Sequence, residues 1–207
     1  MAVMSWEFES PPGHQNKNVM DKNNLAYLIG IAMGDGNLSN PNGRAVRLRI
    51  SCDTKYKNLM DNIILSIQKL LPKNKVAIVK RRDNCADISC YSNKWESLLN
   101  WKAKDGSKES QKISIPDWIK NNKQYSLLCL KGLFETDGSI YTDRKYLMAN
   151  FVTIIPTLAN DVMEIIRSLG FKPNMQLRKE LNGKTKHTIR ISKNTEEFIK
   201  LVKIDKS

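Results

Sequence analysis

The sequence has few of the residues from which structural zinc sites and disulfide frameworks are built. It contains only two histidines, His14 and His187, in 207 residues. Its four cysteines show no C-x-x-C pairing; they are Cys52, Cys85, Cys90 and Cys129. Zinc sites need clustered thiolates and imidazoles at short spacings. We therefore expect buried free thiols and a fold that needs no cross-link.

A hydrophobic run long enough to cross a bilayer is also missing. The longest apolar stretches, around Leu25 to Met33 and Leu127 to Phe134, fall well short of the roughly 20 residues that a transmembrane helix requires. The first residues contain Pro-Pro-Gly and no basic segment followed by an apolar run, so no secretory signal is expected. These absences predict an intracellular protein without membrane association, in a bacterial or archaeal cytoplasm or in an organelle.

Acidic residues are scarce relative to basic ones. The chain has 21 of the first and 34 of the second, which leaves a formal net charge of +13. This excess predicts a polyanionic partner. The basic residues alternate with β-branched and aromatic residues instead of forming one tail, as on the face of a sheet. The side chains expected to contact the partner are Arg44, Arg47, Arg49, Ser51, Lys80, Arg82, Lys145, Gln176, Arg178, Thr188 and Arg190.

Two apolar segments, Asn24 to Met33 and Ser126 to Thr136, end in the same way. The first runs into Gly-Asp-Gly at Asp35 and the second into Asp-Gly at Asp137. Each segment is apolar on nearly every side, which predicts helices that are buried all round. Asp-Gly is also a common turn dipeptide, but two copies in the same frame after matching helices favour a shared role.

The segments after the two helices also repeat. Strand and helix patterns predict the order α-β-β-α-β-β-α twice, with the hairpins turning at Asp83-Asn84 and Asn182-Gly183. The predicted fold is therefore α+β, with two pseudo-symmetric halves and antiparallel sheets. The expected organisation is an N-terminal arm (1–23), a first half (24–101), a linker (102–124) and a second half (125–207).

Strand alternation assigns the two faces of each sheet. In Ala45 to Cys52, the apolar side chains point one way while Arg47, Arg49 and Ser51 point the other. The same rule places Met175 and Leu177, and then Ile189 and Ile191, toward the helices. Two such sheets side by side would present one long basic, hydrogen-bonding surface.

Small residues indicate where the two central helices meet. Gly30 and Gly34 lie four positions apart on one face, and Gly132 and Thr136 are their counterparts. Glycine inside a helix costs about 1 kcal/mol relative to alanine, so close packing against a partner helix is the expected compensation. A pseudo-twofold pair would bring Asp35 and Asp137 together.

Such a pair of carboxylates is electrostatically unfavourable. Each lies at a helix C-terminus, where the dipole disfavours an anion by roughly 0.3–1 kcal/mol. Two charges about 4 Å apart would add about 4 kcal/mol of repulsion at an effective dielectric of 20. A divalent cation with hard oxygen ligands removes both penalties, and Mg²⁺ suits this donor set. Metal held beside a basic surface predicts phosphodiester hydrolysis.

These residues resemble a known motif. Leu28-Ile29-Gly30-Ile31-Ala32-Met33-Gly34-Asp35-Gly36 and Leu130-Lys131-Gly132-Leu133-Phe134-Glu135-Thr136-Asp137-Gly138 are both similar to the LAGLIDADG motif of homing endonucleases. The resemblance extends through the element order across nearly the whole chain. It implies a monomer whose two sheets form a saddle on double-stranded DNA with a long, weakly symmetric target.

The resemblance also implies roles for individual residues. Asp35 and Asp137 match the metal-binding acids, with the carbonyls of Gly34 and Thr136 as further ligands. Two or three Mg²⁺ ions are implied, for which Mn²⁺ or Ca²⁺ can substitute in vitro. A residue that positions the attacking water usually follows the second strand; Asp53 is the substitute here, and Thr153 lies at the matching place in the second half. The candidates for the activating lysine are Lys112 and Lys193.

A second function stays open. A group I intron maturase, or a regulator of the same fold that no longer cleaves, would also bind nucleic acid, and intron RNA would then be a partner. Retention of both Asp35 and Asp137 favours the nuclease, because a protein that only binds has little need of the pair.

Overall fold

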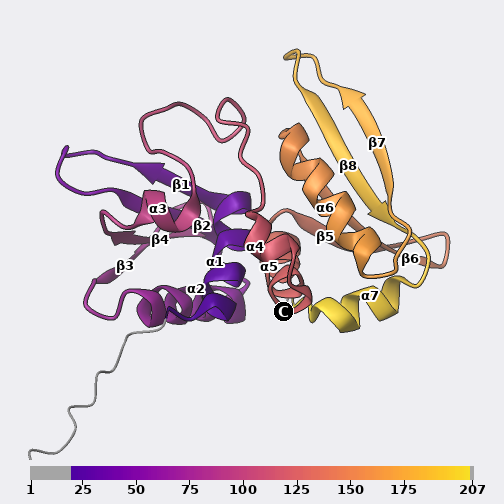
Figure 1. Ribbon diagram of the computed structural model, residues 1–207, viewed down its shortest axis with the longest axis horizontal. Helices are drawn as coiled ribbons and strands as arrows, with labels where there is room; N and C mark the ends of the chain where they lie inside the picture. Colours follow the sequence, from indigo (N-terminus) through magenta and orange to yellow (C-terminus); the bar gives the residue numbers. More distant parts are fainter. Residues whose placement is uncertain (1–19, 206–207) are drawn as a thin grey trace, which may run out of the picture.

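The computed structural model describes residues 20–205. The expected N-terminal arm therefore lies outside the described residues except for its last few positions. Two 14-residue helices, α1 (Lys22–Asp35) and α5 (Lys123–Thr136), lie beside each other at the centre of the molecule (Figure 1). Both have side-chain N-caps: Asp21 accepts a hydrogen bond from the Asn24 amide at 3.1 Å, and Asn122 accepts one from the Tyr125 amide at 3.1 Å.

Each central helix begins one half of the chain. In the first half α1 is followed by β1 (Gly36–Ser39), β2 (Arg47–Asp53), α2 (Lys57–Leu70), β3 (Val76–Lys80), β4 (Cys85–Tyr91) and α3 (Trp95–Leu99). In the second half α5 is followed by β5 (Gly138–Asp143), β6 (Tyr146–Thr153), α6 (Pro156–Ser168), β7 (Asn174–Lys179), β8 (Thr185–Ile191) and α7 (Thr195–Val202). The predicted order α-β-β-α-β-β-α is confirmed in both halves. A short helix, α4 (Asp117–Lys120), was not predicted.

The two sheets have the same topology. Their strand orders are β1-β2-β4-β3 and β5-β6-β8-β7, and all strand pairs are antiparallel. The registers also correspond, since Gly36 lies opposite Ile50 and Gly138 lies opposite Phe151. In Figure 1 the sheets lie on either side of the central helices. The α+β architecture with two repeated halves is therefore confirmed.

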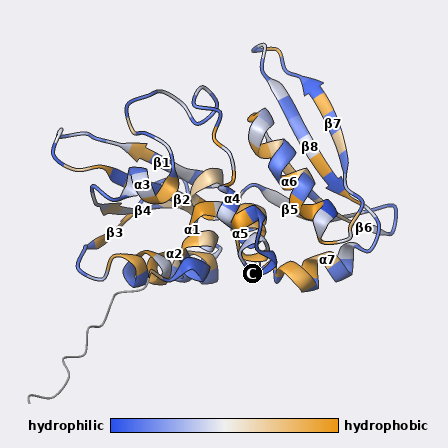
Figure 2. Cartoon of the chain, viewed as in Figure 1, coloured by the Kyte–Doolittle hydropathy of each residue, from blue (hydrophilic) through white to orange (hydrophobic). Residues whose placement is uncertain are grey.

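The core contains most of the predicted apolar positions. Leu25 through Met33 are all buried, as a helix surrounded by protein requires, and Figure 2 shows hydrophobic colouring along α1. In β2, residues Leu48, Ile50 and Cys52 are buried while Arg47 and Arg49 are partly exposed, so the predicted alternation is confirmed there. All four cysteines are free, and three of them are buried.

One residue lies on the predicted face of its strand without being buried: Leu177 pairs with the buried His187, as Met175 pairs with the buried Ile189. Leu177 in β7 is 64% exposed, although alternation placed it in the core beside Met175. The strand β7 is the edge strand of its sheet, and no helix covers it at this point: its residues are exposed or only partly buried. Ile189 and Ile191, in the neighbouring strand β8, are buried as predicted.

The central helices approach closely enough to exclude side chains at three positions. A Cβ atom at Gly30 would lie 2.1 Å from the Cys129 carbonyl oxygen, and one at Gly132 would lie 2.5 Å from the Tyr27 carbonyl oxygen. A Cβ atom at Gly34 would lie 2.1 Å from Thr136 Oγ1. The predicted close packing of α1 against α5 is confirmed. None of the helices in the described part of the chain is long and apolar enough to span a bilayer.

Candidate active site at the helix ends

Asp35 and Asp137 both lie at the C-terminal ends of the central helices. Asp35 is the last residue of α1, and Asp137 is the C-cap of α5. Both residues are exposed, so their carboxylates are accessible from solvent. A Cβ atom at Gly34 would lie 3.2 Å from Asp137 Oδ2, which shows that the end of α1 adjoins the carboxylate of α5.

A cavity opens beside these helix ends. Its volume is about 340 Å³, and its lining comes from both halves and from the segment between them. Gly34 and Asp137 contribute from the helices, and Thr153 contributes from the end of β6. The remaining polar lining consists of Ser107, Lys108, Glu109 and Lys184.

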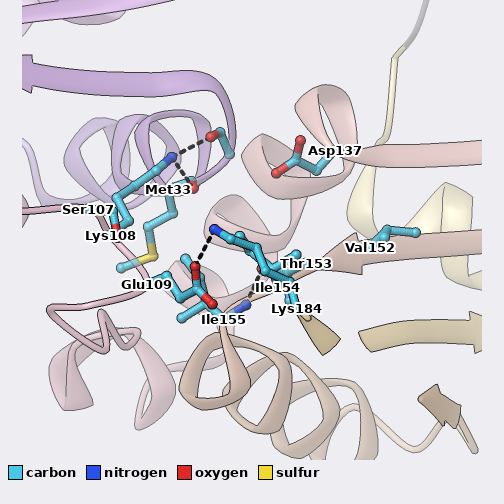
Figure 3. A pocket seen from close by; sticks show the side chains of 11 residues that line it. Met33, Ser107, Lys108, Glu109, Asp137, Val152, Thr153, Ile154, Ile155 and Lys184 are labelled. Atoms are coloured by element: carbon cyan, nitrogen blue, oxygen red, sulfur yellow. Dashed lines mark hydrogen bonds and ion pairs between the residues drawn. The ribbon is translucent and has the colours of Figure 1, made fainter. Parts of the chain in front are cut away.

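Among the described residues, Lys108 is the lysine whose side chain is hydrogen-bonded to the C-terminal end of α1. Its Nζ donates hydrogen bonds to the carbonyl oxygens of Met33 at 2.7 Å and of Gly34 (Figure 3). It also donates to the Ala32 carbonyl oxygen at 3.3 Å. Burial lowers the pKa of the Lys108 ammonium, while the carboxylates of Asp137 and Asp35 act in the opposite direction. The negative charges of Asp35 and Asp137 therefore both act on the Lys108 ammonium group, which links the two helix ends electrostatically.

Lys108 was not predicted from the sequence. It is separated from Gly34 by 74 residues and lies in a polar stretch that carries no strand or helix pattern. The contact depends on how the connecting segment folds, so no spacing in the sequence indicates it. The two lysines that were proposed instead lie elsewhere: Lys112 and Lys193 are exposed, and neither lines the cavity.

Asp53, proposed as a water-positioning residue, lies at the end of β2 opposite Cys85. It does not line the cavity; it accepts a hydrogen bond from the Lys55 amide at 3.0 Å and pairs with Lys55 Nζ at 3.1 Å. These bonds lower the pKa of its carboxyl, the backbone bond most. The register places Thr153 in the second half at the position of Cys52, one residue before Asp53.

The Cys52 thiol lies close enough to the Asp35 carboxylate for the two groups to interact electrostatically. Burial, and then the Asp35 carboxylate, raise the pKa of the Cys52 thiol to about 12. The thiol therefore stays protonated at neutral pH in the metal-free protein. Within residues 20–205, no group of three or more His, Cys, Asp and Glu side chains could hold a metal ion. Any ion here would depend on two carboxylates, backbone carbonyls and external oxygen ligands.

The outward face of the first sheet combines basic and acidic groups. Ser51 donates to Asp87 at 2.6 Å, and the guanidinium groups of Arg49 and Arg81 lie 3.9 and 3.8 Å from the same carboxylate. Arg47 donates to Ser39 at 3.2 Å. The arginines are thus held in place by neighbours, although the face is less uniformly basic than predicted.

The second sheet carries its polar groups at the predicted places. Gln176 and Arg178 are exposed on β7, and Thr188 and Arg190 are partly exposed on β8. Glu180 lies 3.9 Å from Arg178 and 3.3 Å from Lys186. The remaining candidates for contact with the partner are exposed in turns or strand ends: Arg44, Lys80, Arg82 and Lys145.

This fold and this site define a class of protein. The family model described as a LAGLIDADG-like domain matches residues 124–203, and the model described as the WhiA LAGLIDADG-like domain matches residues 24–106. Each model thus covers one of the two halves found in the structure. The chain therefore has a two-motif LAGLIDADG fold.

Solved structures share this architecture. The crystal structure of I-DmoI in complex with DNA and Mn superposes with a TM-score of 0.63 at 21% identity, covering 90% of this chain and 97% of that one. Mesophilic variants of the homing endonuclease I-DmoI give 0.64 at 20%, covering 87% and 95%. Full-length DUF199/WhiA from Thermatoga maritima gives 0.62 at 13%, covering 89% and 56%. No curated protein matches the sequence.

Proposed function

We propose that this protein is a site-specific endonuclease that hydrolyses phosphodiester bonds of double-stranded DNA with divalent metal ions at Asp35 and Asp137. The observation that carries the proposal is the meeting of two exposed acidic helix ends between two sheets with polar, largely basic outward faces. A DNA complex is among the I-DmoI structures that share the fold, which supports DNA as the partner.

The donor set suits a hard cation. Asp35 and Asp137 offer exposed carboxylate oxygens, with the Gly34 and Thr136 carbonyls as further proposed ligands, and oxygen donors are those that Mg²⁺ prefers. I-DmoI has been crystallised with DNA and Mn, with 2 mM Mg, and with DNA and Ca. When bound, two or three Mg²⁺ ions would stabilise charge on the attacking and leaving oxygens at phosphorus.

The chain's own residues hold the DNA and set the charge around the scissile phosphate. The partly exposed arginines of β2 and β8 would contact the duplex from the two sheets, one half-site each. Lys108 lies at the helix ends, whereas Lys112 and Lys193, the lysines predicted to activate the reaction, do not line the cavity. Asp53 or Thr153 would position water; Thr153 lines the cavity and Asp53 does not.

The target and the assembly depend on the two unequal halves. Because both motifs lie in one chain, we propose a monomer that reads a long, weakly symmetric duplex. The first sheet presents the Arg49–Asp87–Arg81 cluster, whereas Asn150 and Thr188 stand at the places of Arg49 and Asp87 in the second. Different side chains at corresponding places imply different base preferences in the two half-sites.

A second candidate function is nucleic-acid binding without cleavage, as a regulator or an intron maturase that takes RNA. The observation in its favour is the hydrogen bond from Lys108 to the Gly34 carbonyl, because a permanent ammonium at this place would leave less need for a metal ion. The match of residues 24–106 to the WhiA LAGLIDADG-like domain is compatible with this function.

A cleavage selection distinguishes the two functions. A plasmid library with a randomised insert is incubated with the protein and Mg²⁺ or EDTA, and linearised products are sequenced. We expect Mg²⁺-dependent double-strand cuts at one sequence class. Asp35→Asn and Asp137→Asn should each lower the rate at least roughly 10³-fold, the effect of losing about 4 kcal/mol of transition-state stabilisation, while DNA binding persists.

Asp61→Asn is the matched control, since Asp61 is exposed on α2 in the first half and lines none of the site. This variant should cut like the wild type. Robust cleavage by Asp35→Asn or Asp137→Asn would refute the metal assignment. Tight, sequence-selective binding with no cleavage by the wild type would instead support the non-cleaving function.

A further inference from the structure

The segment between the halves, residues 102–112, folds into a closed loop. The Gln111 side chain donates to the carbonyl oxygens of Lys102 at 2.9 Å and of Gly106 at 3.0 Å, and it accepts from the Lys102 amide at 2.8 Å. At the tip, the Ser110 amide donates to Ser107 Oγ at 3.0 Å. Bonds that join the base and tighten the tip are typical of a compact Ω-loop, so this segment is more than a spacer.

This loop, which we call the strap (residues 102–112), is attached to both halves at its tip. Lys108 donates to the carbonyl oxygens at the end of α1, in the first half. The next residue, Glu109, forms an ion pair with Lys184 at 2.6 Å, in the second half (Figure 3). The strap therefore lies across the cavity that contains Asp137 and Gly34.

The chemistry at the tip is that of a cation site. The last carbonyls of a helix carry partial negative charge, and here the carboxylates of Asp35 and Asp137 add to it. An ammonium group has three donors, and Lys108 directs its donors to three successive carbonyl oxygens. One of these carbonyls, that of Gly34, is a proposed ligand of the divalent metal.

Ordinary capping of a helix by lysine does not account for this arrangement. A lysine on the last turn of a helix usually interacts with the carbonyls from the surface and keeps its ammonium hydrated. Lys108 comes from a separate segment and is only partly exposed, and the neighbouring Glu109–Lys184 pair holds its backbone in place. Desolvating an ammonium is costly unless it faces negative charge, which the two acids provide.

We propose that Lys108 is the resident cation of the candidate metal site. In the metal-free protein its ammonium group is hydrogen-bonded to the Gly34 carbonyl oxygen and offsets the negative charge of Asp35 and Asp137. A divalent ion binds only when the strap withdraws from this position. The proposal rests on the metal site assigned above but not on DNA cleavage. Lys108 acts here as a positioning residue, and no bond is made or broken.

If Lys108 must leave the site before a metal ion can bind, the affinity of the wild type for that ion is weakened by a measurable factor. A minor conformer of a protein is commonly populated at about 0.1–10%, and the affinity of a ligand that needs this conformer falls by the same fraction. If the withdrawn strap is the minor conformer, it weakens metal binding by roughly 10- to 1000-fold. Removing the ammonium should recover this factor.

The test is a titration of the protein with Mn²⁺ alone, in which electron paramagnetic resonance measures the free ion. We expect Lys108→Met to bind Mn²⁺ at least about tenfold more tightly than the wild type. Lys108→Arg keeps the cation and should resemble the wild type. Lys104→Met is the matched control, because Lys104 is exposed on the same loop and contacts none of the α1 carbonyls.

Equal Mn²⁺ affinity of Lys108→Met and the wild type overturns the proposal, and so does a failure of Lys108→Met to bind Mn²⁺ at all. Thermal unfolding establishes that each variant is folded. A second measurement needs no variant: hydrogen exchange of the wild type with and without Mn²⁺. Exchange at the amides of Ser110 and Gln111 should rise when Mn²⁺ binds, while α2 stays unchanged.

Unchanged exchange in the strap at saturating Mn²⁺ overturns the proposal independently of the variants. The cleavage selection is a separate test with a separate readout. If the protein does not cut DNA but Lys108→Met gains Mn²⁺ affinity, the resident-cation proposal stands and the nuclease fails. The reverse outcome leaves the nuclease and removes the resident cation.

Discussion

Glu135 shows how an acid two residues from a candidate metal ligand can have a purely structural environment. Its side chain is 1% exposed, and its carboxylate accepts hydrogen bonds from Tyr27 Oη at 2.7 Å, from Lys131 Nζ and from the Asp205 amide at 3.1 Å. These bonds join α5 to α1 and to the C-terminal segment. The charge of Glu135 is therefore satisfied within the protein, and we assign it no part in metal binding.

Tyr27→Phe tests this role. The variant removes one hydrogen bond to a buried charge, so we expect the free energy of unfolding to fall by about 1.5–3 kcal/mol, measured by urea denaturation. Tyr125→Phe is the control: its ring packs edge-on against Trp118 at 5.4 Å, and its loss should be much smaller. Equal losses in the two variants would contradict the assigned bond.

Residues differ in how far the sequence predicts them. Asp35 and Asp137 were identified because each follows an apolar helix in the same frame, and a repeated pattern carries more information than a single dipeptide. Lys108 was not, because its contact with Gly34 is fixed by the closure of a loop and by an ion pair with Lys184 at the next residue. Alternation and helical periodicity contain no information about such contacts.

At the scale of elements, the α1–α5 pair is the feature on which the site depends. Their separation is set by backbone contacts at Gly30 and Gly132, so these positions also set the distance between the two acids. The buried apolar faces of the two helices supply their association.

Gly30→Ala should therefore destabilise the protein even though alanine favours helices. Its Cβ would lie 2.1 Å from the Cys129 carbonyl oxygen, and relief of such overlap typically costs about 1–3 kcal/mol or more. The gain in helix propensity offsets only about 1 kcal/mol. Denaturation measures the net loss, and Mg²⁺-dependent cleavage should fall with it as the helix ends separate.

Gly170→Ala is the comparison for this variant. Gly170 has φ +91° at the end of α6 and no atom near its Cβ position, so alanine there adds backbone strain of about 1–2 kcal/mol without touching α5. Cleavage by this variant should stay normal. If Gly30→Ala is as stable and active as the wild type, the helices do not depend on close backbone contact.

Asp161 anchors the base of the linker to α6. Its carboxylate accepts from the Ile115 amide at 2.7 Å and from Lys120 Nζ at 3.1 Å, and Asp161 is buried. Asp161→Ala should lower the free energy of unfolding by about 3 kcal/mol, because it leaves the buried Ile115 N–H group and the partly buried Lys120 ammonium group without their acceptor. Glu164→Ala, on an exposed position of the same helix, should change little. Calorimetry distinguishes the two variants.

The elements themselves were largely predictable. The hairpin turns predicted at Asp83-Asn84 and Asn182-Gly183 fall between β3 and β4 and between β7 and β8. The exceptions have physical causes: α4 has only four residues, too few for periodicity, and Leu177 lies on an edge strand where no helix covers it. Alternation predicts the faces of a strand but not whether a neighbour covers them.

At the scale of the whole molecule, charge is distributed unevenly between the halves. The outward face of the first sheet balances Arg49 and Arg81 against Asp87, whereas the second sheet opposes its cations mainly with Glu180. The net charge of +13 nevertheless gives the molecule a positive field toward a polyanion. The halves should thus contribute unequally to backbone binding, although their folds match.

The dependence of DNA affinity on salt measures this contribution. If the two sheets neutralise roughly 6–10 phosphates, counterion release predicts that affinity falls about 10³- to 10⁵-fold between about 50 and 200 mM salt. Lys80→Ala should reduce the slope by about 1 if Lys80 contacts a phosphate, whereas Lys69→Ala on α2 should leave it unchanged. Fluorescence anisotropy with a labelled duplex gives the slopes. A nearly flat dependence would be incompatible with a saddle that grips the backbone, because sequence-specific contacts alone release few counterions.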